Sequence, residues 1–387
     1  MYDPKRLKIF LVAGEPSGDL LASRLMTGLI ELFGQENLEF HGVGGPLMEE
    51  KGLKSLFPMD ELTVMGIAEV LPQLKNLLKR IKHTASHANS VQPDVFITVD
   101  APDFSFRVAK KLKDASFLKV HYVAPSVWAW RPGRAKKIAG LYDHLLTLLP
   151  FEPPYFEKEG LAASFVGHSI IESGADKGNR DKFRRAHGIG EDTKLLMMLP
   201  GSRKGEVTRH LDIFTDSVRH VMQNVRNLKL VIPVIGKTRP LVTEYFQNTD
   251  LEPLLVEAAG EKYDAMAASD AALAASGTVG LELAMAGLPS VIAYRMHPVT
   301  SYLARKLVKL DYVNLVNILE EQEVVPEFLL EDCTVENLSP AIKKLLTDNN
   351  AVEQQQAGYN SAMSKLQGNG EAPGLQAARI VKELISG

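Results

Sequence analysis

The residues best suited to chemistry lie in the stretch SDAALAASGTVGLELAMAGLPSVIAYR, which begins at position 269. Its pattern predicts a buried strand, a turn of small residues, a helix that stops at a Gly-Leu-Pro sequence, and another strand. Ser276, Gly277 and Thr278 form the turn, where the first N–H groups of the helix can receive an anion. Glu282 lies about one helical turn further on, where a carboxylate can accept the hydroxyls of a ribose. An ordinary β-α-β unit with a surface glutamate explains the same residues equally well.

A second glycine turn occurs in LPGSRKGEV, where Gly201 is followed by Ser202 and Arg203. The turn follows a strand-like segment and precedes a predicted helix. The planar guanidinium of arginine matches the geometry of phosphate oxygens. The alternative is a basic surface loop, but two anion-suited turns in one half of the chain favour a phosphate site.

Asp100 ends the strand-like segment DVFITVD. Burial among apolar neighbours would raise the pKa of this carboxyl and suit it to act as a general base. The alternative is a strand-end acid whose oxygens bond loop amides. The sequence contains no Asp-x-Asp pair, HExxH or GxSxG motif. We therefore expect no metal and no cofactor, with Arg203 and helix N-termini neutralising a leaving diphosphate.

Two further loops are candidates for binding an acceptor substrate. In AGEPSGD, the small residues Gly14 and Ser17 would let a ligand approach the backbone, and Glu15 could bind a sugar hydroxyl. In SVWAWRPGR, Trp128 and Arg131 could hold an acceptor or an anion. A simple turn and a packing anchor, respectively, are the competing interpretations.

The segment VMGIAEVLPQLKNLLKRIKH predicts an amphipathic helix. Its apolar face carries Leu74, Leu77, Leu78 and Ile81, and lysines and an arginine occupy much of the rest. Such a helix can lie in a membrane interface. Most helices of this kind pack on a core, and the sequence alone favours that interpretation.

Composition sets the class of protein. The 387 residues are 45% hydrophobic and 24% charged, which is typical of a globular chain long enough for two domains. A net charge of −3 gives no reason to expect nucleic-acid binding. The single cysteine is consistent with a reducing compartment. We expect a cytoplasmic protein, because no export signal and no run of about 20 apolar residues is present.

Strand-like and helical segments alternate through two halves of the chain, which predicts an α/β protein with two doubly wound, Rossmann-like parallel sheets. We expect an N-terminal domain over residues 1–170 and a linker over 171–192. A C-terminal domain would follow over 193–355, and a helical segment over 356–387. Ligands of such sheets gather at the carboxyl ends of the strands, so the turns described above would face a cleft between the domains.

Taken together, the motifs resemble the lipid-A-disaccharide synthase family. They are AGEPSGD, VMGIAEVL, ITVDAPDF, HYVAPSVWAWR, LPGSR, SDAALAASGTVGLELAMAGLP, YRM and KLDYVNLVNIL, in the family's order from about Ile9 to Cys333. The resemblance implies a GT-B fold whose last helix crosses back to the N-terminal domain. It also implies an inverting, metal-independent transfer from UDP-2,3-bis(3-hydroxyacyl)glucosamine to the 6-hydroxyl of 2,3-diacylglucosamine 1-phosphate (lipid X). The products would be the β-1,6-linked tetraacyl disaccharide 1-phosphate and UDP.

The resemblance also assigns roles by position. It implies that Asp100 is the general base, that Arg203 binds the diphosphate and Glu282 the ribose, and that Asn317 takes part in donor binding. A loop amide with no catalytic role is the alternative for Asn317. The resemblance implies a peripheral protein on the cytoplasmic face of the inner membrane. It therefore favours membrane contact as the role of the amphipathic segment.

Two other functions remain open at this point. A UDP-sugar epimerase on the same fold would act without an acceptor, and a non-catalytic UDP-sugar or lipid-binding protein would not need Asp100 for affinity. A homodimer is also compatible with the sequence.

Overall fold

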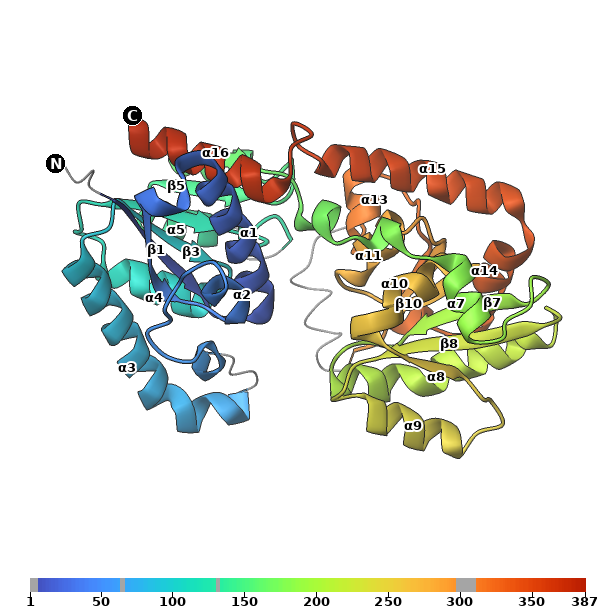
Figure 1. Cartoon of the computed structure of the whole chain (residues 1–387). Helices are drawn as coiled ribbons and strands as arrows, with labels where there is room; N and C mark the ends of the chain where they lie inside the picture. Colours follow the sequence, from blue (N-terminus) through green and yellow to red (C-terminus); the bar gives the residue numbers. More distant parts are fainter. Residues whose placement is uncertain (1–5, 63–66, 130–132, 297–310) are drawn as a thin grey trace. The chain divides into compact units, whose positions relative to one another are not determined.

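The computed structural model describes residues 6–62, 67–129, 133–296 and 311–387 (Figure 1). The side chains of 67–74 and 258–259 lie outside this description. The chain forms two compact units, one of residues 1–169 with 366–387 and the other of residues 170–365. Each unit contains one six-stranded sheet in which every strand pairing is parallel, as the alternating sequence pattern predicted.

The first unit has the strand order β2-β1-β3-β4-β5-β6. Its strands are β1 (Leu7–Ala13), β2 (Leu38–Val43), β3 (Val95–Val99), β4 (Leu118–Tyr122), β5 (His144–Thr147) and β6 (Ala162–Phe165). Its helices are α1 (Pro16–Phe33), α2 (Pro46–Glu49), α3 (Ile67–Val91), α4 (Pro102–Lys111), α5 (Arg134–Ala139), α6 (Pro153–Glu157) and α16 (Pro373–Ser386).

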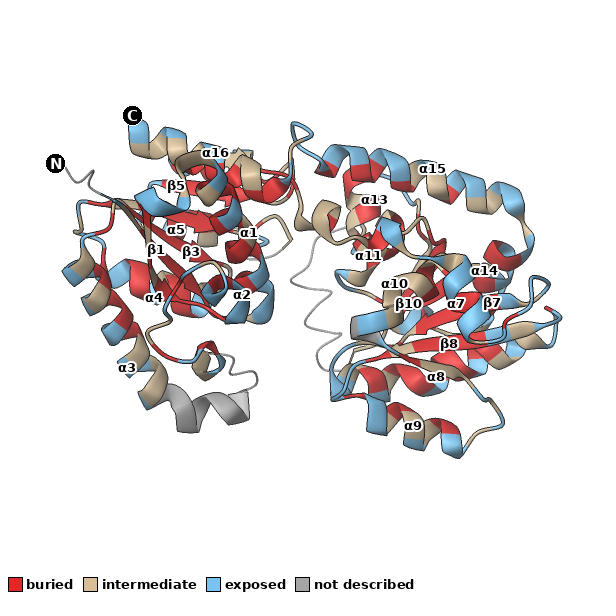
Figure 2. Ribbon diagram, viewed as in Figure 1, coloured by how far each residue is buried: buried red, intermediate tan, exposed pale blue. Residues whose placement is uncertain are grey.

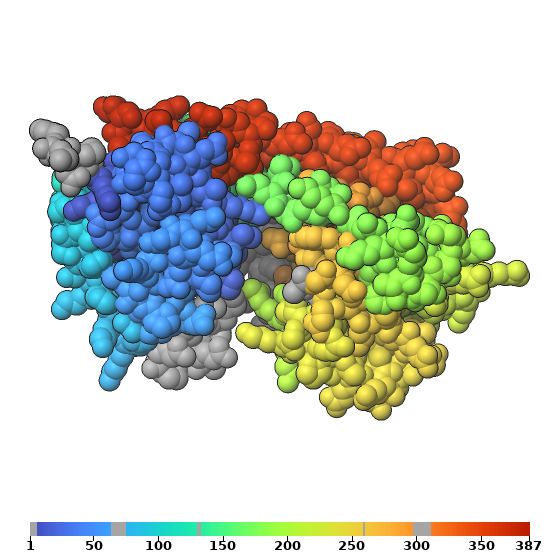
Figure 3. All heavy atoms as spheres, in the orientation of Figure 1, coloured from blue at the N-terminus to red at the C-terminus, as the bar shows by residue number. Residues whose placement is uncertain are grey.

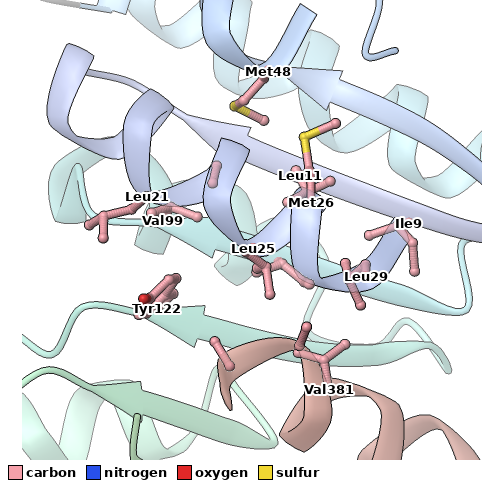
Figure 4. Packing of buried hydrophobic residues seen from close by; sticks show 14 of the residues in the cluster. Ile9, Leu11, Leu21, Leu25, Met26, Leu29, Met48, Val99, Tyr122 and Val381 are labelled. Atoms are coloured by element: carbon pink, nitrogen blue, oxygen red, sulfur yellow. The ribbon is translucent and has the colours of Figure 1, made fainter. Parts of the chain in front are cut away.

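Apolar side chains fill both faces of the first sheet, so its central strands are buried along their length (Figure 2). On one face, Ile9 and Leu11 of β1 pack against Leu25 and Leu29 of α1 (Figure 4). Val381 of α16 belongs to the same cluster. The last helix therefore returns to the first unit, as expected, and in the space-filling view its red atoms lie against the blue atoms of α1 (Figure 3).

The second unit has the strand order β12-β11-β10-β7-β8-β9. Its strands are β7 (Lys194–Leu199), β8 (Leu228–Val234), β9 (Leu254–Glu257), β10 (Ala271–Ala275), β11 (Ser290–Tyr294) and β12 (Glu327–Leu329). Its helices are α7 (Arg180–Ala186), α8 (Lys204–Met222), α9 (Arg239–Gln247), α10 (Ala258–Ala268), α11 (Val279–Met285), α13 (Leu315–Glu320), α14 (Val335–Thr347) and α15 (Asn349–Leu366).

The segment 171–192, for which the sequence predicted a linker with one short helix, belongs to the second unit. It contains α7, which packs against α10. The backbone N–H of Asn179 donates to Asp264 of α10 at 2.8 Å, and Arg184 bonds the carbonyl of Thr193 at 2.8 Å. These contacts attach the segment to the second sheet.

Each sheet has one place where the strand order reverses direction along the chain. In the first unit the chain moves from β1 outward to β2 and then returns to β3 on the other side. In the second unit it moves from β7 through β8 to β9 and then returns to β10. Ligands of doubly wound sheets bind at the carboxyl ends of strands beside such a reversal. Asp100 follows β3, and the two predicted anion turns follow β7 and β10.

Candidate active site

A pocket of about 550 Å³ opens at the carboxyl ends of β7, β8 and β10 in the second unit. A volume of this size is ordinary for a small-molecule site. Seven of the residues predicted to bind a donor line it, namely Gly201, Ser202, Arg203, Ser276, Gly277, Thr278 and Glu282. The neighbouring strands β7 and β10 thus bring together two turns that lie about 75 residues apart in the sequence.

The turn after β7 is shaped by Gly201, whose φ of +128° places it in a region that residues with a side chain rarely adopt. A Cβ there would lie 2.7 Å from the Cβ of Glu206. Glu206 in turn accepts the backbone N–H groups of Ser202 and Arg203, each at 3.3 Å. The amides expected to bind phosphate at this turn are therefore bonded to a carboxylate in this structure, which the sequence analysis did not anticipate. Arg203 is 67% exposed, and its guanidinium approaches Glu206 only to 3.7 Å.

The turn after β10 leads into α11, as the sequence predicted. Oε1 of Glu282 accepts a hydrogen bond from Nζ of Lys262 at 2.6 Å and from the hydroxyl of Tyr263 at 3.3 Å. Lys262 also lines the pocket. The carboxylate is therefore held in place and its charge is balanced before any ligand enters.

Lys262 was not predicted as a site residue, because it lies on α10, outside every glycine turn. Its only sequence signal is the charged pair Glu261-Lys262 at the start of a helix of small residues, and such a pair is common on surfaces. Among the described residues, two basic side chains therefore line the pocket, Arg203 and Lys262, where one was predicted.

His210 is a second residue that the sequence analysis missed. It is fully buried, its Nδ1 lies 2.9 Å from the carbonyl oxygen of Pro200, and its Nε2 lies 3.0 Å from the backbone nitrogen of Arg295. Because a backbone N–H only donates, Nε2 accepts and Nδ1 carries the proton. Burial lowers the pKa of His210, which keeps the ring neutral. The ring thus links the turn after β7 to the end of β11.

Asn317 does not line the pocket, which corrects its predicted place among the donor contacts. The residue is fully buried in α13. Its Oδ1 accepts the N–H groups of Val324 and Val325, each at 2.8 Å. Its Nδ2 donates to the carbonyl of Val325 and to Glu327, each at 2.7 Å. All of its hydrogen-bonding capacity is used inside the protein, so its role in this structure is to fix the loop before β12.

In the first unit, Asp100 and Ala101 both have left-handed backbone conformations, with φ of 51° and 45°. Such conformations cost non-glycine residues of the order of 1 kcal/mol or more each and concentrate at functional sites. Neighbouring backbone bonds hold the strained pair, since Asp100 N–H donates to Tyr122 at 2.9 Å and Ser105 donates to the Asp100 carbonyl at 2.8 Å. Burial raises the pKa of the Asp100 carboxyl, as the sequence analysis expected of a general base.

The turn at Gly14, which follows β1, lies directly beside this pair. A Cβ on Gly14 would lie 2.9 Å from the Cβ of Ala101, so only glycine allows the two turns to approach so closely. Glu15 is half-buried and precedes α1, and Ser17 in its first turn is exposed. The neighbouring parallel strands β1 and β3 thus place Gly14, Glu15 and Ser17 at the same carboxyl-terminal edge of the sheet as Asp100.

Trp128 is half-buried, and its indole N–H donates to Oε1 of Glu152 at 3.2 Å. The ring also meets Phe151 edge to face, with centroids 5.2 Å apart. Burial raises the pKa of Glu152 to about 7. Trp128 is therefore anchored at its polar end, and Arg131, the other predicted residue of this loop, lies outside the described residues.

The apolar residues predicted on one face of α3 differ in how far they are buried. Ile81 is 1% exposed and belongs to the core cluster of β1, β3 and α4, and Leu77 packs against that cluster. These two residues cover the sheet, so the prediction of membrane contact is wrong for Ile81 in this structure. Leu78 is 48% exposed, and the side chain of Leu74 lies outside the described residues.

Among the described residues, no group of three or more His, Cys, Asp or Glu is arranged to hold a metal ion. No helix in the described part of the chain has the length and apolarity needed to span a bilayer.

The fold and the pocket define a class of protein. Two doubly wound sheets, a final helix returned to the first unit and a pocket beside the strand reversal are the architecture of GT-B glycosyltransferases and of epimerases built like them. Acinetobacter baumannii MurG has a TM-score of 0.56 at 12% identity, with 99% of both chains covered. The UDP-GlcNAc 2-epimerase of Neisseria meningitidis, solved with UDP-GlcNAc bound, has a TM-score of 0.60 at 12% identity over 99% of this chain and 100% of its own. At this identity the likeness concerns the fold alone.

The sequence identifies the family within that class. The chain belongs to the lipid-A-disaccharide synthetase family, whose sequence profile matches residues 9–381. The lipid-A-disaccharide synthase of Rhodospirillum centenum is 48% identical over 384 residues, which cover 99% of this chain and 96% of the relative. That of Paramagnetospirillum magneticum is 46% identical over 381 residues, with 97% of each chain covered. The chain is therefore a UDP-sugar glycosyltransferase of lipid A synthesis.

Proposed function

We propose that this glycosyltransferase transfers 2,3-diacylglucosamine from UDP-2,3-bis(3-hydroxyacyl)glucosamine to the 6-hydroxyl of lipid X. The products are the β-1,6-linked tetraacyl disaccharide 1-phosphate and UDP. One observation carries the assignment of the donor site: a guanidinium, an ammonium and the carboxylates of Glu206 and Glu282 line a single pocket at the strand reversal of the second unit.

The donor nucleotide binds in this pocket. Arg203 and Lys262 neutralise the diphosphate, because both are cations that line the pocket. Oε2 of Glu282 accepts from the ribose, since Oε1 is taken by Lys262 and Tyr263. Glu206 turns away from the amides of Ser202 and Arg203 when the diphosphate enters. The long 3.3 Å hydrogen bonds that it makes to them support this exchange.

Asp100 is the general base. Its carboxylate takes the proton of the acceptor 6-hydroxyl while that oxygen attacks the anomeric carbon of the donor, and the bond to the UDP oxygen breaks with inversion. The strained backbone of Asp100 and Ala101 and the raised pKa support this role. The leaving diphosphate keeps the bonding electrons, and the two cations of the pocket stabilise its charge without a metal ion.

The acceptor binds near Gly14, Glu15, Ser17 and Trp128. The close approach of Gly14 to Ala101 supports this assignment, because it leaves the first turn of α1 beside the base. The enzyme acts as a peripheral protein on the cytoplasmic face of the inner membrane, where both acylated substrates reside. The exposed Leu78 on α3, flanked by exposed Lys75 and Lys79, supports contact with that surface.

The test is an assay of the purified protein with both acylated sugars, with and without EDTA, beside the variant Asp100→Asn. We expect disaccharide and UDP in both conditions, a 10²- to 10⁴-fold loss of kcat in Asp100→Asn, and an unchanged affinity of that variant for UDP. Strict dependence on added Mg²⁺ would contradict the metal-free mechanism. Conversion of the donor without an acceptor would indicate an epimerase. UDP binding without turnover by the wild-type protein would indicate a binding protein.

A further inference from the structure

Besides the donor pocket of the second unit, a large cavity lies in the first unit, and the proposed reaction does not use it. This groove of about 860 Å³ lies between α4 and α5. Its basic lining residues are Arg107, Lys110, Lys113, Arg134 and Lys137, and its apolar ones include Phe106, Ile138 and Leu141. Among the described residues, no carboxylate lines it. We refer to it as the α4–α5 groove.

Four of the five cations that line the groove are available to a ligand. The side chains of Arg107, Lys110, Lys113 and Lys137 are exposed and form no ion pair or hydrogen bond with any residue in the described part of the chain. Surface lysines are usually scattered among acidic residues. Several unpaired cations around one concave surface therefore create a local positive potential in a protein whose net charge is −3.

The floor of the groove is apolar and preformed. The ring of Phe106 meets His121 edge to face at 5.0 Å and Tyr142 at 6.0 Å, and both of these residues are buried. Ile138 is 1% exposed and belongs to the core below the groove. A ligand that matches the groove therefore carries an anionic group for the rim and an apolar part for the floor.

We propose that the α4–α5 groove binds the phosphate head group of an anionic phospholipid in a bilayer. The groove belongs to the same unit as the surface already proposed to meet the membrane. Helix α4, which lines the groove, packs on α3, and α3 carries the exposed Leu78. Leu78 then supplies apolar insertion, and the groove supplies recognition of charge. This assignment rests on the proposed membrane association and specifies the lipid that it selects.

The experiment compares binding to vesicles of phosphatidylcholine alone and of phosphatidylcholine with 30 mol% phosphatidylglycerol, at about 0.15 M salt. The test variant is Lys110→Gln/Lys113→Gln/Lys137→Gln. The matched control, Arg6→Gln/Lys54→Gln/Lys158→Gln, removes the same charge from exposed positions of the same unit. Each lysine close to an anionic surface contributes about a fivefold change in partitioning, so we expect a loss of roughly a hundredfold for the test variant on anionic vesicles. We expect no loss on neutral vesicles and less than a threefold change for the control.

A soluble lipid separates a head-group site from general attraction to a charged surface. Dihexanoyl phosphatidylglycerol, kept below its critical micelle concentration, should bind the wild-type protein saturably with one molecule per chain and should not bind the test variant. Inorganic phosphate at the same concentration should not displace it, because phosphate leaves the apolar floor empty. Equal displacement by phosphate would overturn the lipid assignment in favour of a plain anion site.

The outcomes also separate this assignment from the one on which it rests. Equal loss in the test and control variants, or equal binding of wild-type protein to both vesicle types, overturns the groove and leaves membrane association in place. If wild-type protein binds neither vesicle, membrane association fails, and the absence of dihexanoyl phosphatidylglycerol binding then overturns the groove as well. Unchanged thermal unfolding of the test variant excludes loss of the fold as the cause.

Discussion

The ammonium of Lys262 lies 2.6 Å from Oε1 of Glu282, and both side chains line the pocket of the second unit. Lys262 comes from α10 and Glu282 from α11, so the pair joins two helices that line the pocket. If the pocket binds a diphosphate, as proposed, the ammonium of Lys262 offsets the repulsion that the carboxylate of Glu282 would otherwise exert on it.

Replacement of Lys262 by methionine is expected to weaken UDP binding by one to two orders of magnitude, or about 1.4–2.8 kcal/mol. The variant loses a cation and leaves Glu282 unbalanced beside the diphosphate. Isothermal titration calorimetry measures the change. The double variant Lys262→Met/Glu282→Gln should bind UDP more tightly than Lys262→Met, because the unbalanced charge is gone. Equal affinities of Lys262→Met and the wild-type protein would show that the pair has no part in nucleotide binding.

The contact between Gly14 and Ala101 can be tested by exchanging which residue carries the methyl group. Gly14→Ala places a Cβ 2.9 Å from that of Ala101 and is expected to lower the free energy of unfolding by about 1–3 kcal/mol. Gly14→Ala/Ala101→Gly removes the clash and places glycine at a φ of 45°, so it should recover most of that loss. Urea unfolding at constant m-value measures both. If the double variant is no more stable than Gly14→Ala, the steric explanation is wrong.

Glu152 gives a pH-dependent prediction. Its pKa is raised from 4.5 to about 7 by burial, so the folded protein binds more protons than the unfolded chain between these values. The contribution of Glu152 to stability is therefore full below pH 4.5 and is lost as the pH rises through about 7. Glu152→Gln cannot lose that proton. Between pH 4.5 and 8 the stability of the variant should thus rise relative to wild type by about 3 kcal/mol.

Urea unfolding of both proteins at several pH values measures this difference. Loss of one hydrogen bond from Trp128 or from the N–H of Leu149 adds an offset of about 1 kcal/mol that does not vary with pH. A difference in stability that stays constant from pH 4.5 to 8 would mean that Glu152 does not titrate in this range. The fluorescence of the wild-type protein should change with the same midpoint, because Trp128 bonds the titrating carboxyl.

On the apolar face of α3, Leu78 is exposed and Ile81 is buried, so substitutions at these two positions should affect different properties. Leu78→Ser should reduce binding to neutral vesicles with little change in thermal unfolding, because Leu78 is 48% exposed. Ile81→Ser should lower the free energy of unfolding by about 2–5 kcal/mol, because it removes buried volume and buries a hydroxyl. Vesicle co-sedimentation and thermal melts measure the two effects. Undiminished vesicle binding by folded Leu78→Ser would exclude α3 as the insertion element.

Local sequence was sufficient for most of the fold. Apolar runs of the sequence predicted ten of the twelve strands in the described part of the chain, since parallel strands covered on both faces are continuous apolar runs. The two that were missed, β6 and β12, are short edge strands of four and three residues, with no fully buried position. An edge strand is defined by its backbone pairing with one neighbour, and a sequence of mixed polarity does not reveal that pairing.

The turns with chemical character were also evident from the sequence, because glycine, serine, arginine and a strand-end acid have distinctive local effects. Contacts between segments far apart in the chain were not evident from the sequence. The bond of Glu206 to the predicted phosphate amides, the pairing of Lys262 with Glu282 and the saturation of Asn317 each depend on which side chains the sheet brings within about 3 Å.

The sequence by itself thus determined the element types, the positions of the turns and the family, because these depend on short-range periodicity and on residues that act through their own backbone. Only the tertiary structure decided which turns share a pocket, which face of α3 is core, and that α4 and α5 enclose a basic groove. These properties arise from strand order and helix packing, and the free energy that sets them is distributed over contacts between residues far apart in the chain.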